Sequence, residues 1–141
     1  MTIYLDTSSL VKLLIEEAGS LDVLEQVEQA DLVVTLSLTY TEARSALARR
    51  LRERKVSPRA HAEGRRALEE TWAAMVVVGI DDDLCRRAGE MVDQYRLRAY
   101  DSLHLAAYES IARDAAPEPA MFSSADVALN RAAAAVARRL R

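Results

Sequence analysis

The chain has 141 residues, of which 50% are hydrophobic and 29% charged, so we expect a single globular domain spanning residues 1–141. Its 19 basic and 22 acidic side chains give a formal charge of −3, which excludes the strongly basic surface of a protein that coats nucleic acid without sequence preference. Because Cys85 is the only cysteine, an internal disulfide framework is excluded as well, and a reducing compartment is expected.

Short apolar or β-branched runs predict four strands, each separated from the next by helix-like sequence. Runs that are continuously apolar are typical of parallel strands whose two faces are covered by helices. The chain has few glycines and prolines but many alanines, and this composition favours helices. The sequence therefore predicts an α/β fold with a parallel sheet. The predicted strands cover residues 2–5, 32–36, 75–80 and 120–122.

Helical spacing and capping residues occupy most of the chain between these strands. Ser57 and Pro58 supply a helix N-cap and a first-turn proline. The three aspartates at 81–83 precede a periodic apolar stretch, so we interpret them as a helix start rather than a metal site. Residues 115–119 are interpreted as a short linker. The predicted helices cover residues 9–17, 21–29, a long stretch around 43–51, 58–74, a stretch around 84–92, and 100–113.

Four acidic residues lie near the predicted carboxyl ends of strands or at the starts of helices. Asp6 directly follows the first strand, and Glu42 lies in the first turns of the helix after the second strand. Asp101 begins a predicted helix, and Asp126 lies just beyond the last strand. Open α/β sheets bind ligands outside the carboxyl ends of their strands. We therefore expect these four carboxylates to converge.

Each acid also has a purely structural interpretation. The three aspartates would serve as N-caps of the helices that follow them, and Glu42 has the Thr39-x-x-Glu42 spacing of a capping box. Capping explains Asp6 least well, because the hydroxyl residues at 7–9 would cap a helix without placing a charge at the end of a buried strand. The combination of all four favours a site.

Clustered carboxylates are suited to Mg²⁺ or Mn²⁺, which prefer oxygen ligands and retain several waters. Cys85, His61 and His104 lack the spacing of a zinc site. The chain also has no Gly-x-x-x-x-Gly-Lys loop, which excludes P-loop ATPase or GTPase chemistry. Ions held by these acids would activate water for phosphodiester cleavage. A small-molecule phosphohydrolase and a catalytically silent interaction module remain alternatives. For the silent module, calorimetry should show no binding of Mg²⁺ or Mn²⁺.

The segments around the acids resemble the PIN-domain ribonucleases, especially the VapC-type toxins of type II toxin–antitoxin pairs. The resemblance spans essentially the whole chain, and its most specific part is Asp101 followed by Ser-Leu-His-Leu-Ala. Its remaining parts are Asp6-Thr7-Ser8 after the first strand, Glu42 after the second, and the segment Phe-Ser-Ser-Ala-Asp at 122–126.

This resemblance implies a PIN-like three-layer fold whose central, mainly parallel sheet has four to five strands. It also implies endonucleolytic cleavage of RNA with Mg²⁺ or Mn²⁺, a homodimer and a cognate antitoxin protein. Hydroxyl groups of Thr7 and Ser124 would support the acids. The family usually ends with a further strand, whereas residues 129–141 are alanine-rich and end in arginines without a clear strand pattern. The implied catalytic acids are Asp6, Glu42, Asp101 and Asp126, with Asp6, Asp101 and Asp126 as metal ligands.

Five further residues complete the expectations. Because only 5% of residues are aromatic, RNA binding should depend on phosphate contacts, for which Arg49, Arg50 and Arg54 are candidates. His104 is interpreted as packed and hydrogen-bonded rather than catalytic, and Trp72 as part of the core or of a dimer interface. No apolar run approaches the ~20 residues of a membrane-spanning helix. The first residues lack a basic leader, so a cytoplasmic protein is expected.

Overall fold

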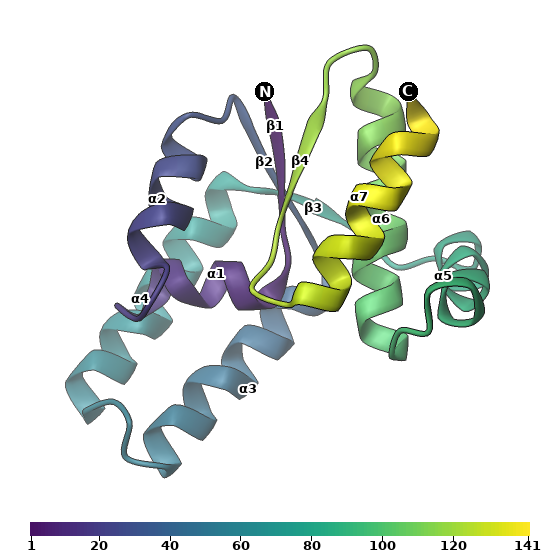
Figure 1. Cartoon of the computed structure of the whole chain (residues 1–141). Coiled ribbons are helices and arrows are strands. Elements are labelled where there is room, and N and C mark those ends of the chain that lie inside the picture. Colours follow the sequence, from purple (N-terminus) through teal and green to yellow (C-terminus); the bar gives the residue numbers. More distant parts are fainter.

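The computed structural model describes residues 1–141, in which each of the first three strands is followed by two helices and the last strand by one (Figure 1). The strands are β1 (Thr2–Leu5), β2 (Leu32–Leu36), β3 (Val76–Val78) and β4 (Ala120–Ser123). The helices are α1 (Thr7–Leu14), α2 (Ser20–Glu28), α3 (Leu38–Arg52), α4 (Pro58–Ala74), α5 (Asp82–Tyr95), α6 (Ala99–Ala115) and α7 (Val127–Leu140).

The four strands form one sheet in the order β3-β2-β1-β4, and every neighbouring pair is parallel. The predicted α/β class and central parallel sheet are confirmed. The chain after β4 forms α7 and adds no fifth strand. An alanine-rich segment has high helix propensity and few β-branched side chains, which accounts for this ending.

Helices cover both faces of the sheet, so the molecule has the three layers expected (Figure 1). In β1, Ile3 and Leu5 pack into a buried cluster with α1, α3 and α4, while Tyr4 between them faces a second cluster with α5, α6 and α7. All three side chains are fully buried. Burying an aliphatic side chain of this size contributes about 1.5–3 kcal/mol, so the central strand is anchored from both sides.

Most helix and strand starts agree with their predicted signals, with differences of a few residues. Asp81 caps α5 by accepting the Leu84 N–H at 2.8 Å, so the helix-start interpretation of the aspartates is confirmed. The first helix begins at Thr7 because its cap is Asp6 rather than a hydroxyl residue. The third strand is shorter than predicted at both ends, because Met75 caps the end of α4 and pairing with β2 stops at Val78.

Trp72 lies on α4 and packs against the cluster formed with α1 and α3. Its ring meets that of Tyr40 edge to face at 5.3 Å between centroids, so the side chain stabilises the packing of α3 on α4. None of the helices combines the length and the apolar composition needed to cross a bilayer.

Candidate functional site

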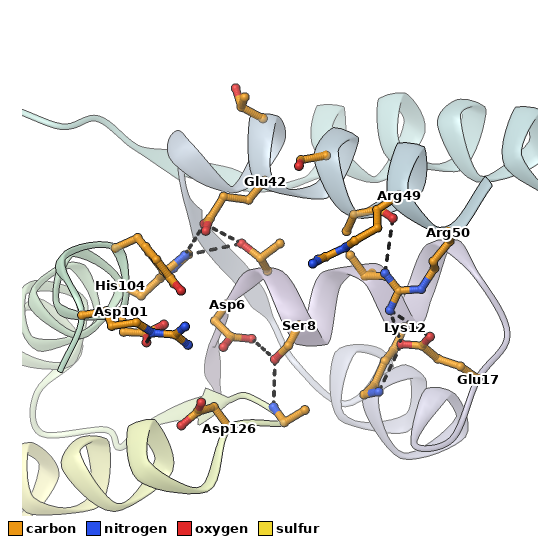
Figure 2. A pocket seen from close by; sticks show the side chains of 18 residues that line it. Asp6, Ser8, Lys12, Glu17, Glu42, Arg49, Arg50, Asp101, His104 and Asp126 are labelled. Carbon is orange, nitrogen blue, oxygen red and sulfur yellow. Dashed lines mark hydrogen bonds and ion pairs between the residues drawn. The ribbon is translucent and has the colours of Figure 1, made fainter. Parts of the chain in front are cut away.

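The sheet topology fixes where a site should form. The chain leaves β1 towards β2 and β3 on one side and returns to β4 on the other. A crevice therefore opens at the carboxyl end of β1, the usual ligand position in such sheets. A cleft of about 580 Å³ lies there, and Figure 2 shows its lining. The four predicted acids all line it: Asp6, Glu42, Asp101 and Asp126.

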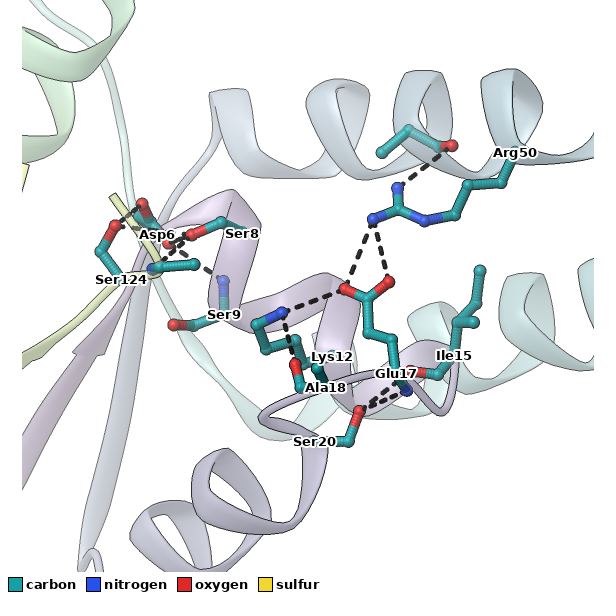
Figure 3. Close-up of polar contacts among 12 residues, drawn as sticks. Asp6, Ser8, Ser9, Lys12, Ile15, Glu17, Ala18, Ser20, Arg50 and Ser124 are labelled. Atoms are coloured by element: carbon teal, nitrogen blue, oxygen red, sulfur yellow. Dashed lines mark hydrogen bonds and ion pairs between the residues drawn. The ribbon is translucent and has the colours of Figure 1, made fainter. Parts of the chain in front are cut away.

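Asp6 is a buried carboxylate that both caps a helix and faces the cleft (Figure 3). Its Oδ1 accepts the Ser9 N–H at 3.0 Å and the Ser8 hydroxyl at 2.7 Å. Its Oδ2 accepts the hydroxyl of Ser124. A carboxylate offers about four lone-pair positions, so one position on Oδ2 remains for a ligand. The capping role predicted as an alternative is thus present together with the convergence.

Glu42 lies in α3 and is held by two donors from other elements. Its Oε1 accepts the Thr7 hydroxyl at 2.7 Å and faces His104 Nε2 at 2.8 Å. Burial acts to raise the pKa of Glu42, but these hydrogen bonds outweigh it and the net pKa is lowered. The capping-box interpretation is wrong. The N-cap of α3 is Ser37, whose side chain makes no capping hydrogen bond, and the Thr39 hydroxyl bonds to a side chain of β2 instead.

Asp101 and Asp126 face the cleft from the starts of two helices. Asp126 caps α7 by accepting the Leu129 N–H at 2.7 Å. Asp101 lies in the first turn of α6, whose N-cap is Arg98, so it is not itself the cap. Burial raises the pKa of Asp101, the Arg98 guanidinium at 3.4 Å opposes that rise, and the charge of Asp126 adds to it. Asp101 and Asp126 therefore lie close enough for the charge of one to disfavour that of the other.

The hydroxyl residues expected to support the acids lie in contact with them. Thr7 bonds to Glu42, and Ser124 bonds to Asp6. His104 is buried and hydrogen-bonded as expected, and it also lines the cleft, as its spacing from Asp101 allows, because residues three apart on a helix share a face. Its contact with Glu42 was not predicted.

The three candidate arginines divide by position. Arg49 and Arg50 line the cleft, whereas Arg54 lies outside it. Arg50 is paired with Glu17 at 3.1 Å (Figure 3), which leaves its guanidinium partly neutralised. Arg49 is exposed and forms no salt bridge within the chain. Arg49 is therefore the more available cation at the rim of the cleft.

A divalent ion such as Mg²⁺ needs oxygen donors and negative charge around it. No group of three or more carboxylate, histidine or cysteine side chains lies close enough to enclose one. Mg²⁺, however, is commonly held by one or two carboxylates and keeps several waters. All four acids offer oxygen donors, Asp6 retains a free lone pair, and Asp101 has a raised pKa. The donor set thus fits a hard divalent cation in type and charge.

Comparisons with known proteins identify the family of this chain. Residues 3–116 match the family model described as the PIN domain. Ribonuclease VapC45 of Mycobacterium tuberculosis (strain CDC 1551 / Oshkosh) is 33% identical over 104 residues, which are 74% of this chain and 72% of that protein. Ribonuclease VapC49 of Mycobacterium tuberculosis (strain ATCC 25618 / H37Rv) matches with the same identity and coverage.

A solved structure shares the fold as well. The crystal structure of PAE2754 from Pyrobaculum aerophilum aligns with a TM-score of 0.62 over 99% of this chain and 95% of that chain, at 19% identity. The residues matched by the family model include Asp6, Glu42 and Asp101, while Asp126 lies beyond them.

Proposed function

Because this chain belongs to the PIN-domain family, we propose that it is a metal-dependent endoribonuclease that hydrolyses RNA phosphodiester bonds with Mg²⁺ or Mn²⁺. The observation that carries the proposal is the convergence of four carboxylates, from four separate parts of the fold, on one cleft at the strand ends. Carboxylates that converge in this way are the ligands that a divalent cation uses when it also binds a substrate phosphate.

The chain supplies the following roles in this proposal. Asp6, Asp101 and Asp126 would hold the ion, one or two of them directly and the rest through its waters, and the ion would supply Lewis-acid activation of water and offset charge on the scissile phosphate. Glu42 stays ionised because its pKa is lowered. Its Oε1 is occupied by Thr7 and His104, and Oε2 has no partner in the chain. Oε2 therefore accepts a hydrogen from the attacking water and orients it.

Substrate binding is assigned to cations at the rim of the cleft. Arg49 is available to a phosphate because it is exposed and forms no salt bridge within the chain. Arg98 also lines the cleft, with its guanidinium 4.9 Å from the ring centroid of Tyr100. Phosphate contacts of this kind are sequence-independent and weaken with salt, so they account for affinity and leave the choice of RNA to other contacts.

The test is cleavage of a panel of structured RNAs by purified protein with Mg²⁺, with Mn²⁺ and with chelator. Asp6→Asn and Asp101→Asn are compared with Asp114→Asn, which changes an exposed acid at the far end of α6. We expect metal-dependent cleavage that both cleft variants lose and the control keeps. Cleavage that persists in both cleft variants contradicts the proposal. If the protein shows neither cleavage nor metal binding, the interaction module is favoured. If it hydrolyses small phosphoesters but no RNA, a phosphohydrolase is favoured.

The proposal extends to the cellular role. The matched relatives are named VapC ribonucleases, and with the resemblance to VapC-type toxins we propose a cytoplasmic toxin that forms a homodimer and is inhibited by a cognate antitoxin protein. Induction of the wild-type chain should arrest growth of a bacterial host, and Asp101→Asn should not. Co-expression of the protein encoded by the neighbouring gene should restore growth and yield a complex on size-exclusion chromatography. Growth unaffected by an actively cleaving wild-type protein would contradict the toxin role.

A further inference from the structure

A line of hydrogen bonds connects the middle of the core to Glu42. The Tyr4 hydroxyl lies 2.8 Å from His104 Nδ1, and His104 Nε2 lies 2.8 Å from Glu42 Oε1. Tyr4 and His104 are both buried, with exposed fractions of 0% and 2%. Figure 2 shows the end of this line, where His104 meets Glu42 at the cleft. The three residues come from β1, α6 and α3.

The chemistry of the three groups sets the direction of each bond. Glu42 is ionised and can only accept, so Nε2 must carry a proton and donate it. In a neutral imidazole the other nitrogen then has no hydrogen and accepts. An ordinary phenol is protonated at neutral pH, and the Tyr4 hydroxyl is fully buried with His104 as its only partner. Tyr4 therefore donates to Nδ1.

The alternative assignments leave a buried group unpaired. If Nδ1 carried a hydrogen, the Tyr4 hydroxyl would have to accept, and its own proton would have no acceptor in the core. An unpaired buried hydroxyl hydrogen is costly. The Tyr4 ring is also fixed, because it stacks on Phe122 at 5.6 Å and meets Tyr108 edge to face at 6.4 Å. Its hydroxyl thus points at one place.

We propose that Tyr4 and His104 are positioning residues: Tyr4 donates to Nδ1 and so supports the Nε2–H tautomer that Glu42 requires, and His104 holds Glu42 so that Oε2 remains available for the attacking water. This inference rests on the proposed function, because it takes Glu42 as the residue that orients water. It assigns a role in the reaction to a histidine and a tyrosine that act through Glu42. Their contribution is to restrict the rotation of one carboxylate.

Nuclear magnetic resonance tests the hydrogen-bond directions without relying on activity. A two-bond ¹H–¹⁵N correlation spectrum distinguishes protonated from bare ring nitrogens. The chain has two histidines, and His61 on α4 supplies an internal reference that His61→Gln assigns. At neutral pH we expect His104 to show a protonated Nε2 and a bare Nδ1. Tyr4→Phe, which keeps the stacked ring, should shift the Nδ1 signal and leave Nε2 protonated. A protonated Nδ1 in the wild type would overturn the proposal.

Two amide substitutions then test the effect on Glu42. The Gln amide in His104→Gln extends to the Nε2 position and can still donate to Glu42, whereas the Asn amide in His104→Asn reaches only the Tyr4 side. We expect His104→Asn to lower the kcat for RNA cleavage about 10- to 100-fold, as for loss of other outer hydrogen-bond partners. The KM should be unchanged, and His104→Gln should restore most of the rate. His61→Gln should cleave as wild type does.

The outcomes separate this inference from the proposed function. If the wild type cleaves no RNA, the nuclease proposal fails while the tautomer measurement still reports the direction of the bonds. If the wild type cleaves and the folded His104→Asn variant, checked by circular dichroism, cleaves equally fast, the positioning role is wrong. Equal losses in the Gln and Asn variants would also overturn it, since only a packing role would make the two amides equivalent.

Discussion

Replacing Asp101 by Asn should change both the stability of the metal-free protein and its response to metal. Burial and the charge of Asp126 raise the pKa of Asp101 in the folded state. Between its unfolded and folded pKa values the folded protein binds more protons than the unfolded chain, so stability falls as pH rises through that interval. Above the folded pKa the cost is constant. Asp101→Asn removes a carboxylate that burial disfavours, so at neutral pH the metal-free variant should be at least as stable as wild type.

The metal response has a calculable size. An ion that binds only the folded state stabilises it by about 2.7 kcal/mol at a concentration of 100 times its Kd. With an unfolding entropy of about 2.1 cal/mol/K per residue, a chain of 141 residues unfolds with about 0.3 kcal/mol/K, and the Tm should rise by about 9 °C. Asp101→Asn should lose most of that rise because one of the proposed ligands is gone.

Differential scanning calorimetry with and without Mn²⁺ provides the assay, with the wild-type Kd taken from isothermal titration. Asp114→Asn is the matched control, since it removes an exposed acid from the same helix and should keep the full metal response. The reasoning is refuted if Asp101→Asn gains the same Tm rise with Mn²⁺ as wild type. It is also refuted if the metal-free variant is clearly less stable than wild type at neutral pH.

Three further outcomes are expected. Fluorescence anisotropy measures binding of single-stranded RNA at several salt concentrations in an Asp101→Asn background. Arg49→Gln should reduce the slope of log K against log salt by about 0.7, the value of one phosphate contact, while Arg54→Gln should leave that slope unchanged. A single 2′-deoxy nucleotide at the cut position should not block cleavage, because water is the nucleophile; 2′,3′-cyclic phosphate ends in mass spectra would contradict this. The Arg87 hydrogen bonds lower the pKa of Glu109 despite its burial, so Glu109→Gln should cost about 1–3 kcal/mol in urea unfolding at neutral pH, and the difference should vanish as pH falls through the folded pKa.

Local sequence signals were sufficient for much of the fold and for the positions of the acids. Ser57 with Pro58 and the aspartate before α5 act within one helical turn, so their effect can be recognised from neighbouring residues. The parallel order of strands follows from their alternation with helices. Because parallel strands end at one edge of the sheet, Asp6 and Asp126 could be expected at the same cleft.

The remaining features depend on contacts between distant residues. Glu42 and His104 are 62 positions apart, and Tyr4 and His104 are 100 apart. No helical or strand periodicity relates residues at such separations. The Thr39-x-x-Glu42 spacing even suggested a competing local role, which tertiary donors overrode. Pairing of Arg50 with Glu17 is likewise set by the docking of α3 beside the loop after α1.

The central claim is that acids from four parts of the chain form one divalent-cation site, and paramagnetic broadening by Mn²⁺ tests it most directly. In a ¹H–¹⁵N spectrum of the wild-type protein, substoichiometric Mn²⁺ should first broaden the amide signals of residues beside Asp6, Asp101 and Asp126, and Asp101→Asn should suppress this. Broadening centred on the acidic start of α5 at residues 81–83, or broadening at the cleft that Asp101→Asn leaves unchanged, would contradict the account.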